Sequence, residues 1–229
     1  MFTIGIVRTT PESPSNQPLF NGIEAPLNAA KTAGIDLLLF DMTYFQERQA
    51  LTFDYEKDIH RLPGMHGEEI ADLHSRLRQE NVPVGLGLFE NDGGGIFSSY
   101  LIFDRDGTLK LKQKQGSRDW IKETANADYR KGLSYETIRF KERTLAFLPG
   151  EDVFCDEKLN ALLDLDTIAD YIICPANKER DDDELKQRSE IFATPLLWFT
   201  KKRTAFLRQG KQLPFDKSAG LDIVTPGNN

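Results

Sequence analysis

Apolar runs that alternate with amphipathic segments are the feature that most constrains the fold of this chain. Residues 35–40 form a run that is apolar except for Asp36, which is typical of a strand covered on both faces. Residues 68–79 place Ile70, Leu73 and Leu77 on one side of a helix, and Asn81 ends it. A strand is expected again at residues 82–89. Because strands alternate with helices along the chain, the sequence predicts an α/β fold.

The remaining elements follow the same alternation. Helices are expected at residues 21–33, with Gly34 as the stop, and at 159–168 and 180–199. Pro26 falls in the first turn of the first helix or marks a kink in it. Loops are expected at residues 9–17, 42–58 and 116–131. Further strands are expected at residues 2–7, 96–103, 108–114, 138–140, 144–149, 171–174, 205–207 and 221–224. No segment has the composition of a linker, so the sequence predicts a single domain spanning residues 1–229.

The charge and cysteine content restrict the partners and the compartment. The 229-residue chain has a net charge of −7, which argues against nucleic acid or an anionic membrane surface as the main partner. Its apolar runs are far too short to span a bilayer, and no basic region precedes the first of them as in a signal peptide. Cys155 and Cys174 suggest no disulfide framework and fit a reducing cytoplasm. The three histidines have no metal-ligand spacing, so neither a metal nor a cofactor is expected.

Residues 104–107 resemble a hairpin turn between the strands expected at 96–103 and 108–114, and the second of these strands carries a row of lysines. Lys110, Lys112 and Lys114 alternate with Leu109 and Leu111, which predicts a half-buried strand. The lysine face has two interpretations. It is either a solvated strand face or a site that binds an anion.

Several short segments together resemble one enzyme family. Residues 34–42 resemble a Gly-Ala-Asp-hydrophobic-Phe-Pro-Glu strand, and the hairpin at 98–114 resembles one that ends in Tyr-Arg-Lys. Residues 145–154 resemble a strand that ends in Cys-x-Asp. Similar matches occur at 83–87, 129–132, 169–176 and 223–227. In order and spacing, these segments resemble the nitrilase superfamily, the carbon–nitrogen hydrolases, across nearly the whole chain.

The resemblance implies a four-layer αββα sandwich and three catalytic groups. In the family a Glu acts as general base and acid, a Cys as nucleophile, and a Lys stabilises the tetrahedral intermediate. Carried over by position, the Glu site falls on Met42 and the Cys site on Gly150. The Lys site falls on Lys114, with Lys112 as the alternative if the hairpin differs by one residue. Two of the three groups are therefore substituted.

Three neighbouring residues could replace the missing groups. Glu47 lies five residues beyond Met42 and could fold back toward the pocket as a base. Cys155 lies five residues beyond Gly150, up to ~16 Å away along an extended chain. Cys174 ends a strand, and strand ends often line α/β pockets. Cys155 is otherwise expected to be a small buried or half-buried residue, and Cys174 a core residue.

The carboxylates next to Gly150 are the remaining pocket candidates. Glu151 and Asp152 follow the substituted position directly. The resemblance implies that Asp152 supports the turn, as the equivalent Asp does in the family.

The sequence supports three functional hypotheses. The first is a nitrilase-type protein without amidase or nitrilase activity that binds a small amide or carboxylate, or serves as a partner or subunit. Its short tail after Gly227 favours a homodimer over a larger family-type assembly. The second is an active hydrolase of a small amide or nitrile that uses Cys155 or Cys174 as nucleophile and Glu47 as base. The third is a pure interaction protein with a filled pocket.

Overall fold

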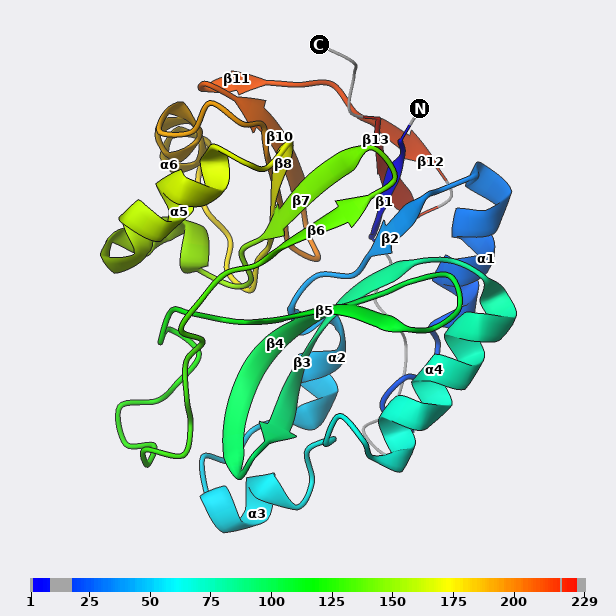
Figure 1. Cartoon of the computed structure of the whole chain (residues 1–229), viewed down its shortest axis with the longest axis vertical. Coiled ribbons are helices and arrows are strands. Elements are labelled where there is room, and N and C mark those ends of the chain that lie inside the picture. The colour runs from blue at the N-terminus through cyan, green and yellow to red at the C-terminus, as the bar shows by residue number, and fades with distance from the viewer. Residues whose placement is uncertain (1, 9–17, 219, 226–229) are drawn as a thin grey trace.

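The chain forms two β-sheets that pack face to face, with helices on both outer faces. The computed structural model describes residues 2–8, 18–218 and 220–225. In Figure 1, helices α1 and α4 lie along one sheet, and α5 and α6 lie along the other. This is the four-layer αββα sandwich that the resemblance implies. The loop expected at 9–17 and the end of the segment 223–227 lie outside the described residues.

The first sheet contains seven strands among the described residues, in the order β12-β13-β1-β2-β3-β4-β5. Its neighbours β1, β2 and β3 pair in parallel, whereas the other pairs are antiparallel. Its strands are β1 (Ile4–Val7), β2 (Leu37–Leu39), β3 (Val84–Asp92), β4 (Gly95–Phe103), β5 (Leu109–Lys114), β12 (Asp216–Ser218) and β13 (Leu221–Val224).

The long helices α1 and α4 pack on the outer face of this sheet. Helix α1 (Glu24–Ala33) buries Leu27, and α4 (Glu68–Glu80) buries Leu73 and Leu77 against the sheet. The left-handed residues Gly34 and Asn81 cap the two helices, as the sequence predicts. Pro26 falls in the first turn of α1, where its missing N–H costs no intrahelical hydrogen bond.

The second sheet has the order β11-β10-β9-β8-β7-β6. Helices α5 (Leu159–Asp166) and α6 (Asp182–Glu190) cover it, and Leu162 and Leu185 pack in the same cluster as Trp198. Its strands are β6 (Thr137–Phe140), β7 (Arg143–Phe147), β8 (Tyr171–Pro175), β9 (Leu196–Phe199), β10 (Thr204–Arg208) and β11 (Lys211–Gln212).

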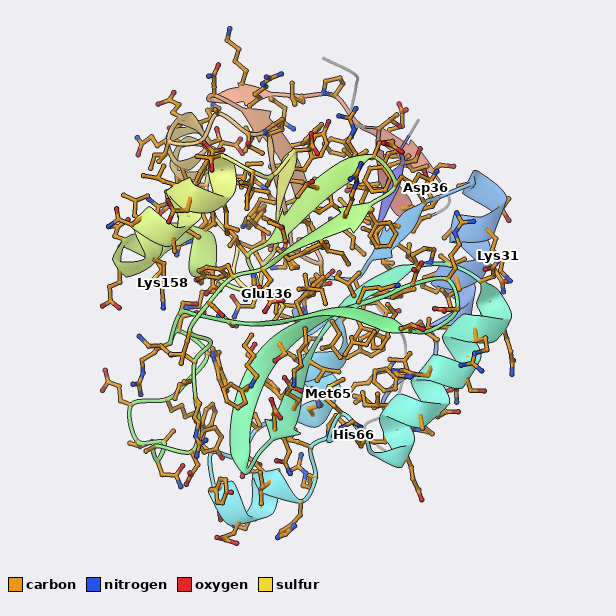
Figure 2. All side chains as sticks on the ribbon, viewed as in Figure 1. Lys31, Asp36, Met65, His66, Glu136 and Lys158 are labelled. Atoms are coloured by element: carbon orange, nitrogen blue, oxygen red, sulfur yellow. The ribbon has the colours of Figure 1, made fainter. Side chains whose placement is uncertain are left out.

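The inner faces of the two sheets form a continuous apolar layer. Tyr100 of β4 stacks on Phe147 of β7, with ring centroids 5.6 Å apart. Figure 2 shows side chains filling the space between the sheets. At the rim, Asp36, labelled in that figure, accepts a hydrogen bond from Lys141 Nζ at 2.6 Å and so joins the β6–β7 turn to the start of β2.

Two predicted segments differ from the structure. Residues 42–58, expected as a loop, contain α2 (Thr43–Gln49) and α3 (Tyr55–Ile59). Helix α2 forms because Tyr44 and Phe45 pack on Phe40 and because Asp41 Oδ1 accepts hydrogen bonds from Thr43 N and Oγ1. Tertiary packing thus decides these short helices, which are too short to be stable alone.

The predicted helix at residues 180–199 extends too far toward the C-terminus. Helix α6 ends at Glu190, and residues 196–199 form strand β9 between β8 and β10. Pro195 disfavours a helical conformation at the residue before it, and a continuous apolar run suits a central strand covered on both faces. The short edge strands β11 and β12 were not predicted. No helix within the described ranges is long and apolar enough to cross a membrane.

Replacing Phe147 with Ala should strongly destabilise the fold, because the variant leaves a cavity between the sheets. We expect the free energy of unfolding to fall by about 3–5 kcal/mol. Chemical denaturation measures this change. As the matched control, Ile168→Ala, at a side chain that is 59% exposed, should change stability by less than about 0.5 kcal/mol. Equal losses in the two variants would contradict the importance of this layer.

Candidate functional site

Gly150 lies in a tight turn directly after β7. Its N–H donates to the carbonyl of Pro175 at 2.8 Å, which ties the turn to the end of the neighbouring strand β8. Its φ of +65° is in the left-handed region that glycine adopts without strain. A short 3-10 helix, residues Asp152–Phe154, follows the turn. The sequence-predicted strand and turn are therefore present.

The side chain of Gln115 fills the space beside Gly150. A Cβ atom built on Gly150 would lie 2.7 Å from Gln115 Oε1 and still closer to Nε2 and Cδ. Ordinary contacts of a Cβ atom are about 3.5–4 Å. Any side chain at position 150 would therefore require Gln115 to move.

Hydrogen bonds hold the Gln115 amide in this place. Its Oε1 accepts from the hydroxyl of Ser98 at 2.7 Å, and Ser98 in turn accepts from Gln46 Nε2 at 3.0 Å. Its Nε2 donates to Ser117 Oγ at 2.9 Å and to Asp119 Oδ1 at 2.7 Å. Gln115 is 1% exposed, and both of its amide donor hydrogens have an acceptor. The amide is a fixed part of the interior.

Met42 lies in the apolar layer between the sheets, at the start of α2. It is fully buried and packs in the same cluster as Tyr100 and Phe147. A Cβ at Gly87 would lie 2.7 Å from Met42 Cα and 2.9 Å from its Sδ, so the backbone of β3 lies directly against this residue. An ionised carboxylate would be costly here without a partner.

Lys114 and Lys112 extend from the opposite face of β5. Leu111 and Gln113 are on the inner face, and the side-chain alternation places Lys112 and Lys114 on the other. Lys114 Nζ lies 2.6 Å from Asp92 Oδ2 and 3.6 Å from the centroid of the Phe97 ring. The structure therefore separates Lys114 from Gly150 and brings Gln115 to it instead.

The two lysines form a charge network on that outer face. Lys112 Nζ lies 2.8 Å from Asp92 Oδ2 and 3.4 Å from Oε2 of the buried Glu90. Hydrogen bonds from Lys112 and Lys114 lower the pKa of Asp92 to about 2. Sequence reasoning missed Gln115, although the period-two alternation of residues 109–115 was a signal for it.

Glu151 and Asp152 lie beside Gly150 and hold the turn. Asp152 is fully buried and accepts hydrogen bonds from Gly116 N at 2.8 Å and Ser117 N at 2.7 Å. Glu151 accepts hydrogen bonds from the guanidinium of Arg180 through Nε and Nη2. Burial raises the pKa of Asp152 to about 6 and also raises the pKa of Glu151. Asp152 thus links the turn after β7 to the segment after β5.

The other candidates lie in different surroundings. Glu47 is half exposed and forms an ion pair with Lys201. Cys174 is fully buried in the cluster under α5 and α6, and burial raises the pKa of its thiol well above the ordinary value. Cys155 is half-buried, and both cysteines are free thiols. No cluster of three or more possible metal ligands occurs in the part of the chain that the structure describes.

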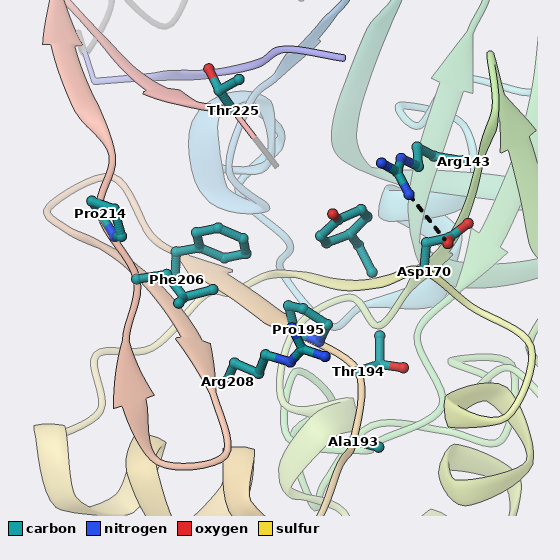
Figure 3. A pocket seen from close by; sticks show the side chains of 11 residues that line it. Arg143, Asp170, Ala193, Thr194, Pro195, Phe206, Arg208, Pro214 and Thr225 are labelled. Atoms are coloured by element: carbon teal, nitrogen blue, oxygen red, sulfur yellow. Dashed lines mark ion pairs between the residues drawn. The ribbon is translucent and has the colours of Figure 1, made fainter. Parts of the chain in front are cut away.

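Open hollows occur away from Gly150. Figure 3 shows one of about 530 Å³ at the edge of the second sheet, where Arg143 faces Asp170 at 3.7 Å and Phe206 and Arg208 lie on the opposite wall. A larger hollow of about 800 Å³ includes Lys114 and Phe97 in its lining. Neither Met42, Gln115 nor Gly150 lines these two hollows.

Comparison with known proteins supports the fold. No protein-family model matches the sequence, and neither does any curated protein. Among solved structures, the NitN amidase of Nesterenkonia sp. AN1 superposes with a TM-score of 0.73 at 15% identity, covering 100% of this chain and 94% of that one. A mutant of that amidase in which acrylamide has added to the active site cysteine gives a TM-score of 0.71 at 15% identity, covering 99% and 94%.

A further mutant of the same amidase, in complex with butyramide, superposes with a TM-score of 0.68 at 15% identity, covering 97% of this chain and 90% of that one. This amidase is described as a member of the nitrilase superfamily. The chain therefore has the fold of nitrilase-superfamily amidases, which confirms the predicted sandwich.

Introducing a Cβ at Gly150 should cost more than backbone strain alone. Gly34 has the same φ of +65° but has nothing within 4 Å of an added Cβ, so Gly34→Ala measures the strain, about 1–2 kcal/mol. Gly150→Ala should cost roughly 2–3 kcal/mol more, because Gln115 must leave its hydrogen bonds. Chemical denaturation of both variants tests this. The double variant Gly150→Ala/Gln115→Ala should be less destabilised than the sum of the single changes, and strict additivity would contradict the contact.

Asp152 should make stability depend on pH. Its folded-state pKa of about 6 exceeds the ordinary value of 3.8, so its contribution to stability is full below about pH 4 and is lost as pH rises through 6. Relative to Asp152→Asn, the wild type should lose up to roughly 3 kcal/mol of unfolding free energy across that window. Asp183→Asn, at a side chain that is 86% exposed, should keep the wild-type profile. If the unfolding free energies of wild type and Asp152→Asn changed in parallel with pH, this would contradict the raised pKa of Asp152.

Proposed function

We propose that this chain is a nitrilase-fold protein without amidase or nitrilase activity, which binds a small ligand or serves as a partner or subunit. One observation carries the proposal. The amide of Gln115 occupies the space that a nucleophilic side chain at position 150 would need. A hydrolase of this fold would require that space for the attacking sulfur and for the substrate carbon.

The chemistry of the three positions supports the proposal. Glycine at 150 has no nucleophile, and the thioether of Met42 cannot accept and return a proton. The residue of the β5 segment that contacts Gly150 is Gln115, whose amide is uncharged. A neutral amide stabilises a developing oxyanion less than an ammonium group does. Removal of a nucleophile alone can reduce turnover by about a million-fold.

The buried surroundings also disfavour a displaced nucleophile. Attack requires a thiolate, and burial of Cys174 favours the neutral thiol. Cys174 lies in the outer cluster of the second sheet, whereas Met42 lies in the layer between the sheets. Glu47, the proposed base of a displaced site, pairs with Lys201 near the surface. Cys155 is half-buried and is the cysteine that an activity test must examine.

The purified protein should not hydrolyse a panel of amides, nitriles and N-carbamoyl compounds at ordinary enzyme rates. Ammonia release measures turnover, and Cys155→Ser and Cys174→Ser are the matched variants. Native Cys174 should resist iodoacetamide at neutral pH because its side chain is fully buried. Thiol-dependent turnover that either Cys→Ser variant abolishes would overturn the proposal in favour of an active hydrolase.

The assembly and compartment belong to the same proposal. A homodimer is part of the proposal, and sedimentation equilibrium of the same preparation tests it. Two free thiols support a reducing compartment such as the cytoplasm.

A further inference from the structure

The connection between β5 and β6 encloses a hollow on the outer face of the first sheet. After β5 the chain makes the long green excursion of Figure 1 and returns along the start of β4. Ile96 N donates to Asp128 O and Arg130 N donates to Ile96 O, each at 2.8 Å. Gly132 N donates to Gln115 O at 2.7 Å. The hollow under this connection has a volume of about 800 Å³.

A buried contact fixes the wall of the hollow. Tyr129, 2% exposed, donates its hydroxyl hydrogen to Asp58 Oδ2 at 2.8 Å. Asp58 also accepts hydrogen bonds from Thr52 N and Phe53 N, so it joins the connection to the segment before α3. The hollow is therefore part of the folded structure, because hydrogen bonds attach its wall to β4 and to the segment before α3.

Positive charge gathers around this hollow. Its lining contains the cationic side chains of Lys114, Arg118, Arg130 and Lys131, in a chain whose net charge is −7. Lys131 lies 3.8 Å from Glu157, which is 81% exposed, so that pair is weak. Arg118 lines the hollow and forms no ion pair among the described residues, so its guanidinium is available to a ligand.

Apolar side chains line the same space. Phe97 forms part of the lining, with Lys114 Nζ 3.6 Å from its ring centroid, and Tyr129 contributes a second aromatic ring. Leu133 is 87% exposed, although most large apolar side chains of the chain are buried. A site with aromatic and aliphatic surface beside several guanidinium and ammonium groups suits a ligand with an apolar body and an anionic head.

We propose that this hollow binds a small organic anion, a carboxylate or a phosphate monoester, whose apolar body packs on Phe97 and Leu133. Arg118 lines the hollow and is free to contact the anionic group, Arg130 would share its guanidinium with Asp128 at 3.2 Å, and Lys114 adds a further cation that Asp92 positions. The inference rests on the proposed function in one respect, which is that the protein binds and releases the ligand without converting it. It assigns Lys114 to this site on the outer face and not to the position beside Gly150.

Binding can be tested with phenylacetate and phenyl phosphate as anions and phenylacetamide as the neutral analogue. Isothermal titration calorimetry of the full chain should give saturable binding of at least one anion, weakened by added salt, and roughly tenfold weaker binding of the amide. Arg118→Gln and Arg130→Gln should each reduce affinity for the anion by roughly tenfold. The matched control is Arg139→Gln on β6, at a side chain that is 72% exposed and outside the hollow.

The outcomes separate the two proposals. Equal binding of the amide and the anions, an equal loss of affinity in Arg139→Gln, or no saturable binding of either anion would each overturn the anion site. Circular dichroism of each variant establishes that a loss of affinity is not a loss of fold. Conversion of phenylacetamide to phenylacetate in the same samples would overturn the proposed function, whereas absent binding without turnover overturns this inference alone.

Discussion

The burial of two sheet faces against each other is the constraint on which the rest of the structure depends. The inner layer joins residues far apart in sequence, such as Tyr100 and Phe147, in a stacked aromatic pair. A core of this kind supplies most of the favourable free energy of folding. It also sets the register of every strand, because a slip by one residue would move polar side chains into the layer.

The same constraint brings Gln115 against Gly150 and links it through Ser98 to Gln46 of α2, the helix that starts after Met42. Met42 follows β2, Gln115 follows β5, and Gly150 follows β7, so three strand ends contribute. In a hydrolase of this fold, such a meeting point would hold a base, a cation and a nucleophile. Here it holds a thioether, a hydrogen-bonded amide and a glycine, and Asp152 binds the turn to the segment after β5. The interior is closed by specific polar contacts and apolar packing.

Successive side chains of strand β5 point to opposite faces of the sheet and so lie in two different chemical environments. Leu111, Gln113 and, beyond the strand end, Gln115 lie toward the interior, whereas Lys112 and Lys114 lie toward Asp92 on the outer face. The lysine that the family resemblance assigned to catalysis thus borders a cationic hollow. The proposed lack of an inner catalytic site and the proposed outer binding site are compatible, because the two faces share a backbone but no side chain.

The sequence by itself determined the alternation of strands and helices, the caps at Gly34 and Asn81, and the absence of a carboxylate at 42 and a thiol at 150. These are local properties that depend on residue type and periodicity. Only the tertiary structure decided that α2, α3 and β9 form, that Gln115 contacts Gly150, and that Lys114 lies on the other face. These features depend on contacts between residues distant in sequence, such as Gln46 with Ser98, and on register, which local pattern does not encode.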